Sequence, residues 1–220
     1  VIQIYILKVT QDVELTYGFA LMHSAIGFIM VGLGFGAIIL FDKQKQLTNL
    51  ALYDPLTGLM NRRGLDFKLT VSLDSAKRSY KCLSAIAVDI DFFKNINDTY
   101  GHDGGDVVLE EIGKLLSSHA RSGDICCRFG GEEFIIALPD TESENAIHIA
   151  ERMRREIAEM QIAFDSRTIN LTSSFGVATH CGAIDVDYLL KDADKALYKA
   201  KETGRNKVCH SKEIEDCSSD

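Results

Sequence analysis

Two adjacent glycines followed by two adjacent carboxylates, within Arg128–Phe134 (RFGGEEF), are the residues of this sequence best suited to chemistry. Apolar residues lie on both sides, so the pattern predicts a strand, a tight turn and a second strand. Gly130 and Gly131 can adopt positive φ and let a ligand approach the backbone closely. Glu132 and Glu133 would stand beside that opening as metal ligands for phosphate chemistry. The alternative is an ordinary hairpin with exposed acids.

A second carboxylate lies at the end of the apolar run Leu83–Val88, where the segment Asp89–Asp106 (DIDFFKNINDTYGHDGGD) begins. The run predicts a buried strand that ends at Asp89. Mg²⁺ is typically held by one or two carboxylates together with phosphates, and Asp89 with Glu132 meets that requirement. Asp91 would point the same way on a continuing strand. A helix cap or a solvated acid is the preferred interpretation for it.

The remainder of this segment is interpreted as a polar loop rich in glycine. Asn97, His102 and Asp106 lie in it and could bind the edge of a nucleotide base through paired donors and acceptors. Asn and Asp are also common turn residues, so each of them, taken singly, is better explained as a turn former.

Helical and extended patterns alternate after residue 53, and these elements must position the polar groups. The alternation predicts an α/β (α+β) fold in which a central, mainly antiparallel sheet is flanked by helices. Expected helices span residues 64–79, 105–120, 142–160 and 186–201, and expected strands span 83–88, 125–129, 134–138 and 169–178.

The N-terminal part of the sequence has a different composition. Residues 19–41 contain no Asp, Glu, Lys or Arg and are long enough to cross a bilayer as one helix. A buried soluble helix is disfavoured because the run is apolar on every face. The sequence predicts a transmembrane helix over 19–41, an N-terminal extracytoplasmic or truncated segment over 1–18 and a helical stalk over 42–53.

Charge and cysteine content restrict the class of protein further. Basic residues follow the apolar run at 43, 45, 62 and 63, whereas Asp12 and Glu14 precede it, so the positive-inside rule places the C-terminal part in the cytoplasm. The net charge of −8 argues against a nucleic acid polymer as partner. The six cysteines show no metal-ligand spacing, so reduced thiols are expected.

Four blocks together resemble the GGDEF domain family. They are DPLTGLMNRRG (Asp54–Gly64), the Asp89–Asp106 segment, RFGGEEF, and DADKALYKAKETGRN (Asp192–Asn206). Active members of this family are diguanylate cyclases, which join two GTP molecules into cyclic di-GMP, and GGEEF is a common active variant. The resemblance implies the palm-like fold of nucleotidyl cyclases for a catalytic domain over 54–210, followed by a polar tail over 211–220.

Carried over residue by residue, the resemblance implies catalytic roles for Glu132 and Glu133. It implies that Asp89, the backbone carbonyl of Ile90 and Glu132 hold two Mg²⁺ ions per active site, with Mn²⁺ as an alternative metal. The resemblance implies guanine recognition by Asn97 and Asp106, with His102 near the nucleotide. It implies phosphate binding by Lys94, Lys201 and Arg205, and places Phe92 and Phe93 among the substrate-binding residues. Lys201 and Arg205 also end an amphipathic helix, whose dipole suits basic residues.

The segment Arg121–Asp124 (RSGD) matches the RxxD inhibitory site of the family at its expected spacing. Arg121 could bind phosphate or the Hoogsteen edge of guanine, and Asp124 could accept from a guanine amino group. Arg152 of a neighbouring domain could complete the site. The alternative is a loop with an incidental ion pair. The resemblance thus implies inhibition by the product.

The resemblance also implies a homodimer, because each domain holds one GTP and two domains must face each other antiparallel before either bond can form. The resulting prediction is a diguanylate cyclase in the bacterial inner membrane, with its catalytic domain in the cytoplasm, GTP as substrate and cyclic di-GMP as product and inhibitor. The competing hypothesis is a catalytically silent GGDEF module that binds GTP or cyclic di-GMP and signals through a partner.

Overall fold

The computed structural model describes residues 2–79, 82–182 and 185–212 and divides the chain into two compact units, Val1–Asn49 and Leu50–Asp220. The first unit consists of one continuous helix, α1 (Ile2–Leu52), whose last residues belong to the second unit. The helical conformation expected for the stalk over 42–53 is therefore found as far as Leu52.

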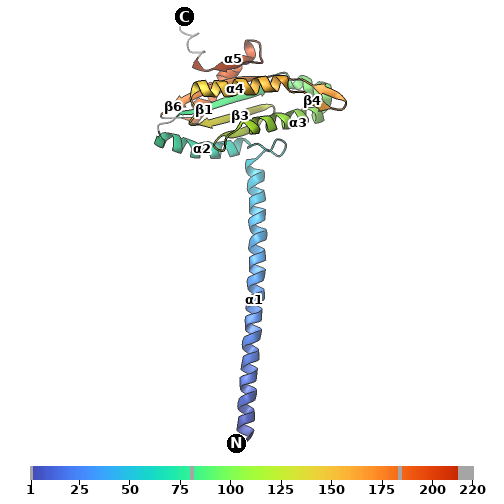
Figure 1. Ribbon diagram of the computed structural model, residues 1–220, viewed down its shortest axis with the longest axis vertical. Coiled ribbons are helices and arrows are strands. Elements are labelled where there is room, and N and C mark those ends of the chain that lie inside the picture. The colour runs from blue at the N-terminus through green and yellow to red at the C-terminus, as the bar shows by residue number, and fades with distance from the viewer. Residues whose placement is uncertain (1, 80–81, 183–184, 213–220) are drawn as a thin grey trace. The chain divides into compact units, whose positions relative to one another are not determined.

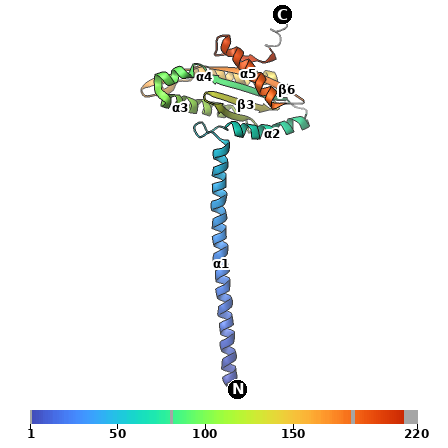
Figure 2. The ribbon, with the colours of Figure 1, turned by 180° about the vertical axis from the view of Figure 1, so that it is seen from behind.

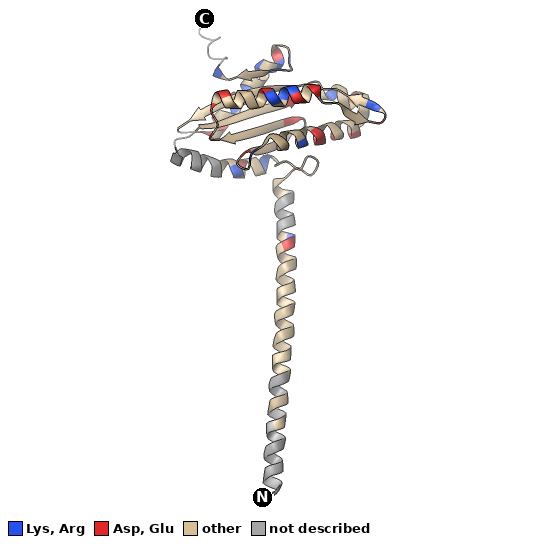
Figure 3. Ribbon diagram, in the orientation of Figure 1, with Lys and Arg blue, Asp and Glu red and all other residues tan. Residues whose placement is uncertain are grey.

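Within α1, the segment Leu21–Gln44 is long and apolar enough to cross a membrane, judged by length and composition. None of its side chains is buried, and large apolar ones such as Phe28 and Phe35 are exposed. Figure 3 shows most of this stretch in the colour of uncharged residues, and in the sequence its first charged residues are Asp42 and Lys43. The segment overlaps the span expected over 19–41 and is a candidate membrane span.

The second unit is built around a five-stranded sheet with the strand order β2-β3-β1-β6-β7 (Figure 1). The central strand β1 pairs antiparallel with β3 and with β6, and the short β7 pairs parallel with β6. The strands are β1 (Cys82–Ile90), β2 (Ile125–Gly130), β3 (Glu133–Pro139), β6 (Ser173–Cys181) and β7 (Val208–His210), and a separate hairpin contains β4 (Ile162–Phe164) and β5 (Arg167–Ile169).

Two pairs of helices cover the two faces of this sheet, as Figures 1 and 2 show from opposite sides. Ile86 and Val88 of β1 pack against one pair, and Ala85 and Ala87 pack against the other, because successive side chains of a strand point to opposite faces. A mixed α/β fold with a central, largely antiparallel sheet is confirmed. The first pair is α3 (Phe93–His119) and α4 (Ser143–Glu159), and the second is α2 (Arg62–Ser79) and α5 (Val186–Glu202).

Helix α3 differs more from the sequence-based expectation than any other long element of the second unit. The expected helix began at residue 105, but α3 begins at Phe93 and continues through a single kink at Gly101 (φ 76°, ψ 172°). Asn97, His102 and Asp106 therefore lie on a helix and not in a polar loop. Buried Phe93 and Ile96 anchor its first turns to the core, which outweighs the low helix propensity of the segment.

Shorter elements were also missed. Strands β4, β5 and β7 contain three residues each, too few for a periodic pattern, and β7 forms only by pairing with β6. The strand expected over 169–178 is divided in the structure, because β5 ends at Ile169 and β6 runs from Ser173 to Cys181.

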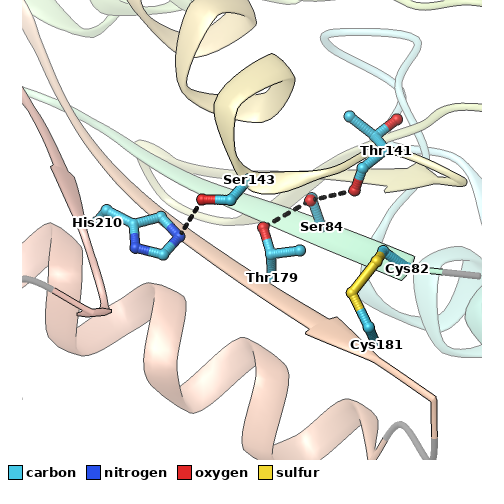
Figure 4. Close-up of a disulfide and its surroundings, with 7 residues drawn as sticks. All are labelled: Cys82, Ser84, Thr141, Ser143, Thr179, Cys181 and His210. Carbon is cyan, nitrogen blue, oxygen red and sulfur yellow. Dashed lines mark hydrogen bonds between the residues drawn. A yellow bond between two sulfur atoms is a disulfide. The ribbon is translucent and has the colours of Figure 1, made fainter.

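The expectation of reduced thiols is wrong for one pair of cysteines, since Cys82 and Cys181 form a disulfide (Figure 4). The two residues lie directly opposite each other in the register of β1 and β6, although 99 positions separate them in sequence. Cys126 and Cys127 lie on β2, as expected, and burial raises the pKa of each thiol to about 12, so neither is a reactive thiolate at neutral pH.

Candidate active site

The glycine–carboxylate motif forms the predicted hairpin tip between β2 and β3. Gly131 adopts φ of 51°, a conformation that favours glycine, and a register shift lies between Arg128 and Gly130. The Nε of Arg128 donates to the carbonyl of Gly131 at 2.9 Å. A bulge of this kind redirects the side chains that follow, here the two glutamates.

The hairpin brings the motif beside the end of β1. Asp89 is paired with Glu133 in the β1–β3 register, and cross-strand partners point to the same face of a sheet. Asp89 is buried, Glu132 is half-buried and Glu133 is exposed. Asp89 and the two adjacent glutamates, which are distant from it in sequence, therefore lie at the same end of the sheet.

Lys201, on the last turn of α5, joins this group. Its Nζ lies 2.8 Å from Oδ2 of Asp89, with side chains that are 31% and 11% exposed respectively. A Cβ at Gly176 of β6 would overlap the backbone of α5 at Ala193 and Leu197, so glycine at this position lets the helix lie close to the sheet. This close packing carries Lys201 to the end of β1.

Asp89 has a shifted pKa, and the cause reflects its surroundings. Burial raises the pKa above its ordinary value of 3.8, and the charges of Glu132 and Glu133 raise it further, while the hydrogen bond and charge of Lys201 partly oppose the shift. The charges of both glutamates therefore act on Asp89, and a site with this negative charge suits a cation.

The kinked helix α3 carries the residues expected to bind guanine. Asn97 lies against Gly105, where a Cβ would overlap the amide oxygen of Asn97, and Asp106 follows directly. Asn97 is half-buried, whereas His102 and Asp106 are exposed. The paired glycines thus allow the two halves of the helix to pack closely. Lys94 is exposed on the first turn of α3 and Phe93 is buried beneath it.

The aromatic ring of Phe92 interacts with Arg205, although the two residues lie far apart in sequence. The guanidinium carbon of Arg205 lies 4.6 Å from the centre of the ring. Phe92 (φ 57°) precedes α3 and Arg205 (φ 58°) follows α5, and both have the left-handed backbone conformation. A planar guanidinium stacked on a ring keeps its N–H groups available for an anion.

An ion pair beneath the hairpin was not predicted. Nη1 of Arg128 donates to Oδ1 of Asp54 at 3.1 Å, and the backbone and hydroxyl of Thr57 donate to the same oxygen at 2.9 and 2.8 Å. Partial burial raises the pKa of Asp54, but these hydrogen bonds outweigh it and hold the pKa below its ordinary value. The DPLTG segment belongs to a block identified from sequence, whereas its partner on β2 required the tertiary structure.

Asp91 is neither a solvated acid nor a helix cap, which corrects the interpretation preferred from sequence. It is 5% exposed, and its carboxylate accepts hydrogen bonds from Thr172, Ser174 and the backbone amide of Asn206. The spacing of two positions from Asp89 drew attention to Asp91 in the sequence. Its hydrogen-bond partners could not be predicted, because they lie more than eighty positions away.

The expected inhibitory residues lie away from the hairpin tip, on the loop from α3 to β2 and on α4. The carboxylate of Asp124 accepts from the backbone amide of Arg121 at 2.8 Å, and the amide of Asp124 donates back to the carbonyl of Arg121 at 3.0 Å. Arg121 and Arg152 are exposed. The loop is thus a tight turn with an exposed arginine.

The residues expected to bind metal are hard oxygen donors, which suit Mg²⁺. Among the residues that the structure describes, no three His, Cys, Asp or Glu side chains form a metal-binding group by themselves. Asp89 already binds one cationic group, the ammonium of Lys201. Two carboxylates and a backbone carbonyl fit a Mg²⁺ ion that shares its coordination sphere with substrate phosphates and water.

Comparison with known proteins supports the resemblance to the GGDEF domain family. A family profile described as "Diguanylate cyclase, GGDEF domain" matches residues 51–207. Diguanylate cyclase A of Treponema denticola is 44% identical over 142 residues, 64% of this chain and 38% of that protein. The response regulator PleD of Caulobacter vibrioides is 44% identical over 162 residues, 72% of this chain and 36% of PleD. The match thus spans little more than a third of either relative.

Solved structures share the fold. The coiled coil and GGDEF domain of DgcB from Caulobacter crescentus, in complex with c-di-GMP, gives a TM-score of 0.76 at 28% identity and covers 80% of this chain and 93% of that one. The active GGEEF domain of a diguanylate cyclase from Vibrio cholerae gives 0.65 at 42% identity, covering 70% and 97%. The chain belongs to the GGDEF domain family.

Proposed function

We propose that this chain is a diguanylate cyclase that condenses two GTP molecules into cyclic di-GMP. The observation that carries the proposal is the convergence of Asp89, Glu132, Glu133 and Lys201 at one end of the sheet. Placing buried and half-buried carboxylates close together is unfavourable, as the raised pKa of Asp89 reflects. A catalytically silent module would not require this arrangement. Similar proteins described as diguanylate cyclases in Treponema denticola and Vibrio cholerae support the same activity.

Metal binding is assigned to Asp89, the carbonyl of Ile90 and Glu132, which would hold two Mg²⁺ ions, with Mn²⁺ as an alternative. These ions would neutralise charge on the phosphates and make the attacking hydroxyl more acidic. Glu132 is proposed to receive the proton of that hydroxyl. Glu133 is proposed to assist by keeping the site negative.

Different residues are proposed to bind the guanine and the phosphates of GTP. Asn97 and Asp106 would bind the guanine, with His102 nearby, because an amide and a carboxylate match the acceptors and donors of that base. Lys94, Lys201 and Arg205 would bind the phosphates, and the backbone at Phe92 and Phe93 would lie beside them. Charge-assisted bonds from ammonium and guanidinium groups favour phosphate oxygens.

In the reaction, the 3′-oxygen of one GTP attacks the α-phosphorus of the other. A new P–O bond forms, the bond to pyrophosphate breaks, and the hydroxyl proton passes to the base. Each domain supplies one GTP, so an antiparallel homodimer is proposed as the catalytic form, and repetition at the second hydroxyl closes the ring.

The candidate span Leu21–Gln44 is proposed to anchor the enzyme in the bacterial inner membrane. Basic residues that follow the span support a cytoplasmic catalytic domain, where GTP is available. The proposed organisation is a segment over 1–18, a span over 19–41, a stalk over 42–53, a catalytic domain over 54–210 and a tail over 211–220.

Product inhibition is proposed to act through Arg121 and Asp124, with Arg152 of a neighbouring domain. The exposed arginines on a hydrogen-bonded turn and on α4 suit phosphate and guanine. Two DgcB structures were solved in complex with c-di-GMP, which supports a cyclic di-GMP site in this fold. Arg121→Ala should raise the cyclic di-GMP concentration that halves the rate, and leave the initial rate unchanged.

The activity test uses the full chain in detergent micelles, supplied with GTP and Mg²⁺. Mass spectrometry should detect cyclic di-GMP and pyrophosphate from the parent and about 10²-fold less cyclic di-GMP, or none, from Glu132→Gln in the same time. Equilibrium binding of GTP to both proteins shows whether the variant still folds and binds. A parent that binds GTP or cyclic di-GMP and forms no product would favour the silent-module hypothesis.

A further inference from the structure

Asp91 is a buried carboxylate for which the reaction proposed above has no direct role. Oδ2 accepts from the hydroxyl of Thr172 at 2.7 Å and from the backbone amide of Asn206 at 3.0 Å, and Oδ1 accepts from the hydroxyl of Ser174 at 2.7 Å. Both oxygens thus bind protein donors, and the residue is only 5% exposed. A carboxylate held in this way fixes the groups around it.

These hydrogen bonds join three segments that are distant in sequence. Asp91 directly follows β1, Thr172 and Ser174 flank the first residue of β6, and Asn206 lies in the turn from α5 to β7. The backbone amide of Asp91 also donates to the carbonyl of Thr172 at 2.9 Å. Asp91 therefore connects the end of β1 to the turn that follows α5 through hydrogen bonds.

The turn after α5 has a backbone conformation that needs such support. Gly204, Arg205 and Asn206 have successive φ values of 114°, 58° and 45°. Two consecutive non-glycine residues with positive φ are unfavourable, and they persist only where the surroundings determine them. Besides Asp91, Arg154 holds the turn, since its Nη1 donates to the side-chain oxygen of Asn206 at 2.8 Å.

The turn presents Arg205 to the proposed phosphate site. Its guanidinium stacks on Phe92, the residue that follows Asp91, with 4.6 Å between the guanidinium carbon and the ring centre. Asp91 thus fixes the backbone on both sides of this pair, because it precedes Phe92 and binds the amide of Asn206, which follows Arg205. Loss of the carboxylate would release both partners of the stack.

We infer that Asp91 is a positioning residue, which holds Arg205 stacked on Phe92 so that the guanidinium meets the GTP phosphates. The inference rests on the proposed binding of GTP at this site and adds a residue that makes no contact with substrate or metal. It predicts that Asp91 acts only through Arg205. A residue needed merely for stability would act on binding whether or not Arg205 were present.

The test compares Asp91→Ala and Asp91→Asn with the parent in the full chain. Asp91→Ala should weaken GTP binding, and raise KM for GTP, by roughly tenfold, the effect of one lost bond to a charged group, with a smaller change in kcat. Asp91→Asn should restore most of the affinity. Its amide oxygen can accept from Asn206, and the hydroxyls of Thr172 and Ser174 can rotate to donate or accept.

A double-mutant cycle separates positioning from general damage. In the Arg205→Ala background, Asp91→Ala should weaken GTP binding no further. Asp192→Ala is the matched control, because it removes a half-buried aspartate that binds His180 and Lys195 elsewhere on the domain, and it should leave GTP affinity unchanged. Equal weakening by Asp91→Ala in both backgrounds would overturn the inference.

Amide hydrogen exchange gives a readout that does not depend on catalysis. The amide of Asn206 should exchange faster in Asp91→Ala than in the parent, while amides of β1 stay protected. Unchanged protection at Asn206 would also overturn the inference. If the parent binds GTP and forms no cyclic di-GMP, the proposed function fails, but the binding cycle and the exchange experiment still decide the role of Asp91.

Discussion

Lys201 on α5 and Asp89 at the end of β1 form an ion pair with 2.8 Å between Nζ and Oδ2, and this pair links the helix to the strand. The ammonium compensates part of the burial of Asp89 and stands where the phosphates of GTP are proposed to bind. The pair therefore connects the electrostatics of the site with recognition of substrate.

Lys201→Ala should weaken GTP binding by about tenfold or more, because a charge-assisted bond to phosphate is lost. It should also raise the pKa of Asp89 further, since Lys201 lowers that pKa in the parent. Equilibrium titration with GTP and Mg²⁺ measures the first effect. Lys191→Ala, an exposed lysine earlier on the same helix, is the control. Equal losses in both variants would show a nonspecific effect of charge.

The raised pKa of Asp89 predicts a dependence of stability on pH. The folded chain keeps the proton to a higher pH than the unfolded chain, whose Asp has the ordinary value of 3.8. The contribution of Asp89 to stability therefore falls as pH rises from about that value through the raised pKa, and stays lower at neutral pH. Chemical denaturation of Asp89→Asn and the parent across this range measures it, and the variant should lack the fall.

The two glutamates of the signature should differ in their effects. Glu132→Gln should lower the rate of cyclic di-GMP formation by about 10²-fold or more, the range for loss of a catalytic base. Glu133→Gln should lower it less, because Glu133 is assigned an electrostatic role. Initial rates at saturating GTP compare them. The reverse order would make Glu133, the register partner of Asp89, the principal ligand.

Asp54→Ala should destabilise the domain by about 1–3 kcal/mol, because Arg128 loses its partner and Thr57 loses an acceptor. It should also slow catalysis, since Arg128 holds the carbonyl of Gly131 in the signature turn. Urea denaturation and initial rates measure the two effects. In a double-mutant cycle, Arg128→Ala should add little to the loss in Asp54→Ala. Full additivity would mean that the ion pair contributes nothing.

Reduction of the Cys82–Cys181 disulfide should lower the free energy of unfolding by about 2–5 kcal/mol, as expected for a crosslink that closes a long loop. Denaturation with and without a reducing agent measures the change. The Cys82→Ala/Cys181→Ala double variant should show the same stability under both conditions. Thiol titration of the oxidised, unfolded protein is an independent check, and two additional free thiols would contradict the bond.

Local patterns were enough to predict the main elements and the hairpin tip. Glycine, carboxylate and apolar residues near one another in sequence specify the turn at Gly130–Gly131 and the strand that carries Asp89 near its end, because backbone preferences and strand alternation are local properties. The same locality explains an error. The glycines of Asp89–Asp106 indicated a loop, but burial of Phe93 and Ile96 makes a helix with one kink.

Tertiary structure alone decided which distant residues meet. The amino-acid sequence by itself determined the apolar segment of α1, the order of the longer strands and helices, and the residue types of the site, all of which are set by neighbours in the chain. The pairs Asp54–Arg128, Asp91–Asn206 and Cys82–Cys181 depend on strand register and on helix packing across the sheet. Those contacts arise only when the core has formed, because side chains many positions apart become neighbours through shared burial.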